Sequence, residues 1–163
     1  MNGDGKRQLL VNNHETDNTK AAVFVYTVPD DIMTGDFEKF TIANDFKNAW
    51  SLFIPNMAPG FPYAVYPDGD TSKPAHVLIA GDGDHSMHCM VPSGDRDKFE
   101  YTDNIVIDAG GTVGALAFQD LNDDGWLEVL MPNYDKGYIE VWTISSAAGA
   151  APLEESFHLR TGN

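Results

Sequence analysis

The amino-acid sequence predicts an all-β fold. Helical periodicity is nearly absent, whereas short β-branched and aromatic runs recur along the chain between Gly, Pro, Asn and Asp residues, which is the pattern of strands joined by turns. The length of 163 residues and the apolar fraction of 42% suffice for one domain with a sizeable core and exclude a disordered chain. We therefore expect one folded all-β domain.

The candidate strands are short apolar runs that end at turn-forming residues. In chain order they cover residues 8–11, 21–28, 37–42, 63–66, 76–80, 86–91, 99–107, 113–118, 127–131, 138–144 and 156–159. Segment 45–53 could form a turn or two of helix before Pro55. Trp50 and Phe53 suit a buried irregular segment equally well, and irregular structure is the favoured alternative.

The chain repeats itself with a period of about 60 residues. Residues 6–13 (KRQLLVNN), 74–81 (PAHVLIAG) and 126–133 (WLEVLMPN) align, and each is followed after a turn by a second apolar strand. A third strand follows in the first two copies, and a weaker one, ESFHL, in the last. This arrangement predicts three blades of a β-propeller, with units 1–46, 47–110 and 111–163. A β-sandwich with irregular turns is the alternative.

Three blades cannot close a ring, because propellers typically have about four to eight. Both ends of the sequence fall inside a repeat: Asn2 begins in the middle of an acidic loop, and Asn163 follows the last outer strand. We therefore expect a fragment or a part of an assembly, with the remaining blades in the same protein or in another subunit.

The charge of the chain favours cations as partners. The 25 acidic side chains outnumber the 10 lysines and arginines and give a formal net charge of −15, which repels nucleic-acid phosphates and anionic lipid headgroups. The longest apolar run, residues 21–26, is far too short to cross a bilayer. We expect no nucleic-acid partner and no membrane insertion. The single cysteine, Cys89, excludes an intrachain disulfide framework.

The loop DLNDDGWLE at residues 120–128 has the spacing of a hard-cation site. Oxygen-bearing side chains occupy loop positions 1, 3, 5 and 9, a glycine permits the tight turn, and one backbone carbonyl can add a ligand. The expected calcium ligands are Asp120, Asn122, Asp124 and Glu128, with the carbonyl of Trp126. An EF-hand is excluded because its twelfth position is Met131 and because strands flank the loop. A solvated turn is the alternative.

The first acidic loop, NGDGKRQ at residues 2–8, is a weaker copy. Asn2 and Asp4 hold positions 3 and 5, but position 1 precedes the chain and position 9 is the neutral Gln8. We expect weaker calcium binding there, or none. The middle acidic stretch, AGDGDH at residues 80–85, follows a strand instead of preceding one. We therefore expect a β-turn there, and no metal loop in the middle copy.

The pattern DxNxDGxxE between two strands, with NGDG as its second copy, resembles the FG-GAP/VCBS repeats of integrin α-subunit heads and of many secreted propeller proteins. The resemblance covers nearly the whole chain as a repeat layout, and its specific motif lies at residues 120–128. It implies calcium at the blade edges, a ring of about seven or eight blades, and an extracellular or secreted location. It also implies a role in recognition, adhesion or scaffolding.

Two functions stay open. The favoured one is a calcium-stabilised binding or scaffold module with a glycan or protein ligand, because no nucleophile, general base or cofactor loop can be singled out. No catalytic residue is therefore assigned. The alternative is a fragment of a propeller enzyme that acts on carbohydrate as a lyase or hydrolase. Its candidate residues are His14, Glu15, His85 and His88. The polar turns at residues 12–15, 81–85 and 133–137 are expected on one face.

Two further features have a structural reading that is favoured over a functional one. His85, His88 and Cys89 could form a soft-metal cluster, but strand alternation points the two histidines to opposite faces. Residues 54–66 (IPNMAPGFPYAVY) are rich in proline and aromatic residues. Packing between blades is the favoured role for this segment, and an exposed ligand platform is the alternative.

Overall fold

The described chain forms three antiparallel sheets and no α-helix. The computed structural model describes residues 1–49, 56–144 and 153–160. Within these residues the only helical element is a short 3-10 helix, η1 (Arg96–Lys98), and no helix has the length and hydropathy that a bilayer crossing requires. The all-β prediction is confirmed.

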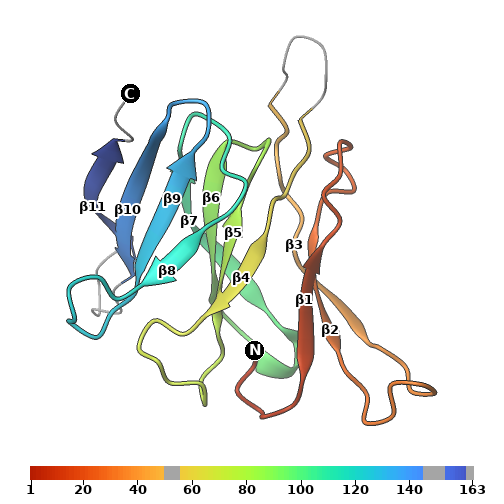
Figure 1. The fold of residues 1–163 in the computed structure, drawn as a ribbon. Helices are drawn as coiled ribbons and strands as arrows, with labels where there is room; N and C mark the ends of the chain where they lie inside the picture. The colour runs from red at the N-terminus through yellow and green to blue at the C-terminus, as the bar shows by residue number, and fades with distance from the viewer. Residues whose placement is uncertain (50–55, 145–152, 161–163) are drawn as a thin grey trace.

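Each sheet consists of strands that follow one another in the chain and run antiparallel to their neighbours (Figure 1). The first sheet contains β1 (Gln8–Asn12), β2 (Val23–Thr27) and β3 (Lys39–Ala43). The second contains β4 (Pro62–Val65), β5 (His76–Ala80), β6 (Ser86–Pro92) and β7 (Tyr101–Asp108). The third contains β8 (Ala117–Gln119), β9 (Glu128–Asn133), β10 (Tyr138–Ile144) and β11 (Leu153–Arg160). None of the sheets closes on itself over the described residues.

Most predicted strands agree with the observed ones to within two residues. The strand predicted at 113–118 begins only at Ala117, because the residues before it bond to two turns instead. The Thr112 carbonyl accepts from the Tyr134 N–H at 3.0 Å, and the Val113 carbonyl accepts from the Asp82 N–H at 2.9 Å. Residues 44–49 are irregular, as favoured, and the rest of segment 45–53 lies outside the described residues.

The second and third sheets repeat the same hairpin register. Ile79 of β5 pairs with His88 of β6, and the equivalent Met131 of β9 pairs with Glu140 of β10. The pairing with the outer strand also shifts register at equivalent places. In β6 the shift against β7 follows Cys89, and in β10 the shift against β11 follows Val141. Such a bulge bends the strand and increases its twist. Two copies of the sequence repeat therefore form the same strand arrangement.

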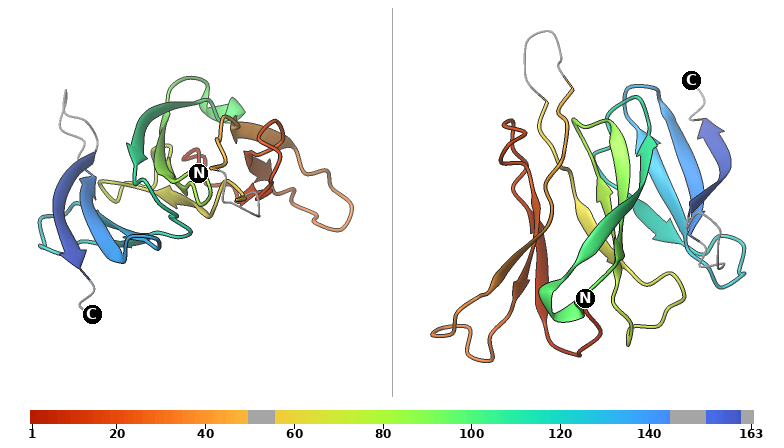
Figure 2. Two further views of the ribbon diagram at one scale, coloured as in Figure 1. Left: turned by 90° about the horizontal axis from the view of Figure 1, so that it is seen from above. Right: turned by 180° about the vertical axis from the view of Figure 1, so that it is seen from behind.

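The second sheet is buried on both faces because its side chains alternate. On β5, Val77 and Ile79 pack against the first sheet, whereas Leu78 and Ala80 pack against the third. All four are fully buried, and a short continuous apolar run is the pattern expected of such a strand. Figure 2 shows the resulting stack, in which the second sheet lies between the other two.

The opposite face of the first sheet is largely uncovered. Leu9 and Val11 of β1 are 48% and 38% exposed. The register places them opposite Tyr26 and Phe24 of β2, so the four side chains share this face. The Lys39 Nζ lies 3.7 Å from the centre of the Phe24 ring, a cation–π contact. The first sheet thus ends the stack in an apolar face.

Truncation of Leu78 tests the burial of the second sheet against the third. Leu78 lies between two sheets with no exposed surface, so we expect Leu78→Ala to lower the free energy of unfolding by about 2–5 kcal/mol. Denaturant unfolding measures the loss. The matched control is Leu9→Ala, on the uncovered face, which should cost about 1 kcal/mol or less. Equal losses in the two variants would contradict this placement of the core.

Candidate functional site

The loop between β8 and β9 gathers its polar side chains around its own backbone. Asp120 accepts from the Gly125 N–H through Oδ2 at 2.9 Å and from the Asp124 N–H through Oδ1 at 3.2 Å. Asn122 accepts from the same Asp124 N–H at 3.1 Å and donates through Nδ2 to Asp124 Oδ2 at 2.9 Å. The φ of +90° at Gly125 is one that side chains disfavour. The residues at loop positions 1, 3 and 5 thus lie together.

Glu128 closes the base of this loop from the first residue of β9. It is 3% exposed, and its Oε2 accepts from the Leu121 N–H at 2.7 Å. Its Oε1 accepts from Thr143 Oγ1 at 3.2 Å. Among the described residues no three His, Cys, Asp or Glu side chains form a ready-made metal cluster. A cation in this loop would share the carboxylate oxygens of Asp120 and Asp124 with these N–H donors or displace the donors.

The loop at residues 2–8 repeats these hydrogen bonds. The Asp4 N–H donates to Asn2 Oδ1 at 3.2 Å, and Asn2 Nδ2 donates to Asp4 Oδ2 at 3.2 Å. The Lys6 N–H donates to Asp4 Oδ1 at 2.8 Å, as the Trp126 N–H does to Asp124 Oδ1, also at 2.8 Å. Each bond connects the same loop positions as its counterpart at residues 122–126.

The backbones of the two loops also agree, with a left-handed φ at positions 4 and 6 of both. These residues are Gly3 (+77°), Gly5 (+76°), Asp123 (+58°) and Gly125 (+90°). Position 9 differs, because Gln8 stands where the later loop has Glu128. The Gln8 Nε2 donates to Asp4 Oδ1 at 3.1 Å. This amide occupies an oxygen that a cation would need, so the first loop is the weaker candidate.

A related loop lies between β4 and β5, in the copy for which the sequence predicts no metal loop. The Ser72 N–H donates to Asp70 Oδ1 at 3.0 Å, the equivalent of the bond from Asp124 to Asn122. The Asp70 N–H donates to Asp68 Oδ1 at 3.1 Å. The alignment of the repeats gives these three residues loop positions 1, 3 and 5. The middle copy thus keeps part of the turn, and residues 81–86 form the expected turn between β5 and β6.

A lysine supplies the cation of this middle loop. Lys73 stands at the position of Gly5 and Gly125, and its Nζ forms ion pairs with Asp68 and, at 3.4 Å, with Asp70. Hydrogen bonds to Asp68 and Asp70 raise the pKa of Lys73, and the ammonium in turn lowers the pKa of Asp68. The spacing of Asp68 and Asp70 before β5 indicates this loop in the sequence. The motif of the 120–128 loop is incomplete here, because Lys73 stands in place of its glycine.

The acidic loops and the polar turns lie at opposite ends of the sheets (Figure 1). The turns between β1 and β2, β5 and β6, and β9 and β10 share one end, as the sequence predicts. His14 Nε2 lies 3.0 Å from Asp82 Oδ2 and so connects the first two turns. Residues 112 and 113 connect the second turn to the third through the bonds from Asp82 and Tyr134.

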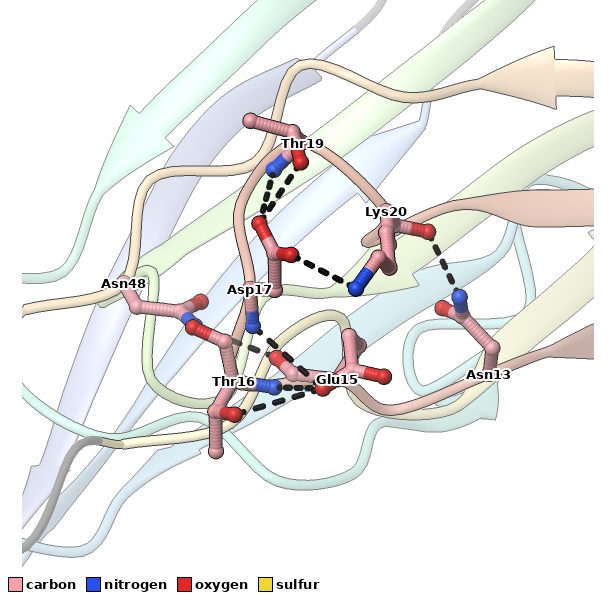
Figure 3. Close-up of polar contacts among 7 residues, drawn as sticks. All are labelled: Asn13, Glu15, Thr16, Asp17, Thr19, Lys20 and Asn48. Atoms are coloured by element: carbon pink, nitrogen blue, oxygen red, sulfur yellow. Dashed lines mark hydrogen bonds and ion pairs between the residues drawn. The ribbon is translucent and has the colours of Figure 1, made fainter.

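Glu15, a candidate acid for carbohydrate chemistry, is used within its own turn (Figure 3). Its Oε1 accepts from the N–H and Oγ1 of Thr16 and from the N–H of Asp17, at 2.8, 3.2 and 3.4 Å. Its backbone carbonyl accepts from Asn48 Nδ2 at 3.1 Å. The hydrogen bonds from Thr16 and Asp17 lower the pKa of Glu15. Such a carboxylate stabilises a turn and is a poor proton donor.

The histidines His85 and His88 lie in different surroundings, one in a turn and one in the core. His85 lies in the second turn with Nε2 3.4 Å from Asn56 Nδ2. His88 faces the first sheet, with its ring 5.1 Å from that of Phe46, whereas Cys89 faces the third. Burial raises the pKa of the Cys89 thiol to about 12. The strand alternation thus separates His88 from Cys89 and disfavours a soft-metal cluster.

His88 is buried in the core, and a carboxylate lies near each of its ring nitrogens. Its Nδ1 lies 3.0 Å from Asp103 Oδ2, and its Nε2 lies 3.4 Å from Asp84 Oδ2. Burial acts to lower the pKa of His88, but the hydrogen bond to Asp103 and the nearby charges of Asp103 and Asp84 outweigh it and raise that pKa to about 9.

Comparison with protein-family models, with curated proteins and with solved structures found no match to this chain. The function is therefore argued from the residues and their geometry.

The ionisation of His88 makes a pH prediction. The folded pKa of about 9 lies above the unfolded value of about 6.5, so the imidazolium stabilises the fold fully below pH 6.5 or so and loses this contribution as the pH rises through about 9. An NMR titration of the ring measures the pKa, and Asp103→Asn should lower it. A ring that titrates near pH 6.5 in the wild type would contradict the ion pairs.

Proposed function

We propose that the chain is a calcium-stabilised module of β-propeller blades that serves extracellular recognition, adhesion or scaffolding. The observation that carries this proposal is the recurrence of one loop conformation, with the same hydrogen bonds, at residues 2–6 and 122–126. Loops with oxygen side chains at alternate positions are typical calcium ligand sets.

The propeller part of the proposal is supported by the stacking of meander sheets. Propeller blades are sheets of about four consecutive antiparallel strands that contact only their neighbours. The second and third sheets have four such strands each, share a hairpin register, and pack face to face. The uncovered apolar face with Leu9 and Val11 is the surface on which a further blade, from the same protein or another subunit, would pack.

The calcium part is supported by charge and by the differences among the three loops. The chain carries a net charge of −15, so carboxylates that converge in a turn need a counter-charge. The middle loop has Lys73 for this purpose. The loop at 120–128 has a glycine at the same position and a carboxylate at position 9, and we assign the calcium ion to it.

A carbohydrate lyase or hydrolase remains the second proposal. It is favoured by the position of the polar turns at one end of the sheets, where propeller enzymes assemble sites from several blades. The contact between His14 and Asp82 joins two of these turns. The hydrogen bonds of Glu15 and the burial of His88 count against it. Turnover of a sugar that is lost in His14→Ala would favour the enzyme.

Calorimetry tests the calcium site. We expect the chain to bind calcium with a dissociation constant of about 10⁻⁴ to 10⁻³ M, the range of extracellular modules. Asp124→Asn should abolish the heat of binding, because it removes the carboxylate at loop position 5. The matched control is Asp123→Asn, which removes the same charge one residue away, outside the ligand spacing, and whose left-handed φ suits asparagine. Unchanged heats in Asp124→Asn would refute the assignment.

Sedimentation tests the uncovered face. Since apolar sheet faces associate in water, we expect the wild-type chain to self-associate as its concentration rises. A double change of Leu9 and Val11 to lysine should reduce this association. The matched control changes Ile32 and Met33 to lysine, because they are even more exposed apolar residues but lie in the connection between β2 and β3. A wild-type chain that stays monomeric at high concentration would count against the blade-packing surface.

A further inference from the structure

A cavity between the first and second sheets contains polar groups that the proposed calcium module does not use. It has a volume of about 220 Å³ and opens to solvent. Its walls come from the end of β3 with the segment after it, from β6 and from β7. Three parts of the chain that are distant in sequence thus form one small site. None of its lining residues belongs to the acidic loops at residues 2–8, 68–73 and 120–128.

The polar wall is centred on His88, which is 6% exposed. Its Nδ1 donates to Asp103 Oδ2 at 3.0 Å. Its Nε2 is buried without a hydrogen-bond partner, although it lies within ion-pair distance of Asp84 Oδ2 at 3.4 Å. Asp84 Oδ2 accepts from the Lys47 N–H at 2.8 Å. The imidazolium is therefore held between two carboxylates from different elements.

The charge of these groups selects the ligand. One imidazolium stands against three carboxylates, since Asp45 and Asp103 both line the cavity and Asp84 lies 3.4 Å from His88 Nε2. The net charge of the group is about −2, and the whole chain is acidic as well. Asp103 Oδ2 is bonded to His88, which leaves Oδ1 to accept from a ligand. The site repels anions and favours a hydrogen-bond donor with a positive charge.

The apolar wall sets the size of the ligand. Ile42, Phe46 and Met90 line the cavity and are each at most 7% exposed. Tyr101 completes this wall and is fixed by the bond from its hydroxyl to the Ala75 carbonyl at 3.0 Å. A dry apolar cavity of about 150 Å³ accepts benzene. A cavity somewhat larger than this suits a small ring or short chain that carries one polar group.

We propose that this cavity binds a small primary amine in its protonated form. The ammonium lies between Asp45 and Asp103, and the apolar body lies against Phe46, Ile42 and Met90. The three N–H donors of an ammonium match carboxylate oxygens from two sides, and the aromatic wall accepts a cation or an apolar group. This site is independent of the calcium loops, so either proposal can fail without the other.

An NMR titration with benzylamine tests the proposal. We expect millimolar binding to the full 163-residue chain, with amide shifts that concentrate at residues 42–46, 88–90 and 101–103. Benzyl alcohol has the same shape without the charge and should bind roughly fivefold more weakly, and benzoate should not bind. Equal affinity for the alcohol, tighter binding of benzoate, or no shift up to about 10 mM amine would overturn the proposal.

Two variants and a control locate the ammonium. Asp45→Asn should weaken benzylamine binding roughly three- to tenfold, because a charged acceptor becomes neutral. Asp45 is exposed and leaves the bonds of His88 intact, so a loss of binding in this variant is not a loss of fold. Asp103→Asn should have an equal or larger effect. The control Asp36→Asn removes an exposed charge elsewhere; if it weakened binding as much as Asp45→Asn, general charge would explain the affinity and the site would be wrong.

Discussion

The double burial of the second sheet is the constraint on which the other features depend. The strands β5 and β6 have buried side chains on both faces. Each neighbouring sheet must therefore turn an apolar face toward them. Because consecutive strands of each sheet are antiparallel, the acidic loops lie at one end of the stack and the polar turns at the other. A loop can hold charge at these ends because the strands beneath it are set by apolar contacts.

Much of this fold could be predicted from local sequence. Runs such as VFVYT in β2 and HVLIA in β5 have β-branched or aliphatic residues between turn formers, and their strand state needs no tertiary information. The start of β8 could not be predicted. Val113 belongs to an apolar run, but its carbonyl bonds to Asp82 from a turn about thirty residues earlier in the chain. Competition of this kind is decided by packing and leaves no local signal.

The site features divide in the same way. The residues of the 120–128 loop lie together because they are close in sequence, so their spacing was sufficient to find them. The middle loop was missed because Lys73 and Ser72 replace the glycine and aspartate of the motif, although the hydrogen bond to Asp70 is the same. The cavity at His88 could not be found at all from spacing. Its groups come from the segment after β3, from β6 and from β7, which meet only when the sheets stack.

One electrostatic problem recurs in three places and is met differently in each. Carboxylates converge at Asp68 and Asp70, at Asp84 and Asp103, and at Asp120 and Asp124. The first pair has the ammonium of Lys73, the second has the imidazolium of His88, and the third has uncharged N–H donors from the backbone and from Asn122. A lysine stays charged at any physiological pH, a histidine depends on its neighbours for its proton, and N–H groups leave a net negative charge. The three regions therefore differ in how much positive charge they need from a dissolved cation. This need is greatest at the 120–128 loop, for which we propose the calcium ion.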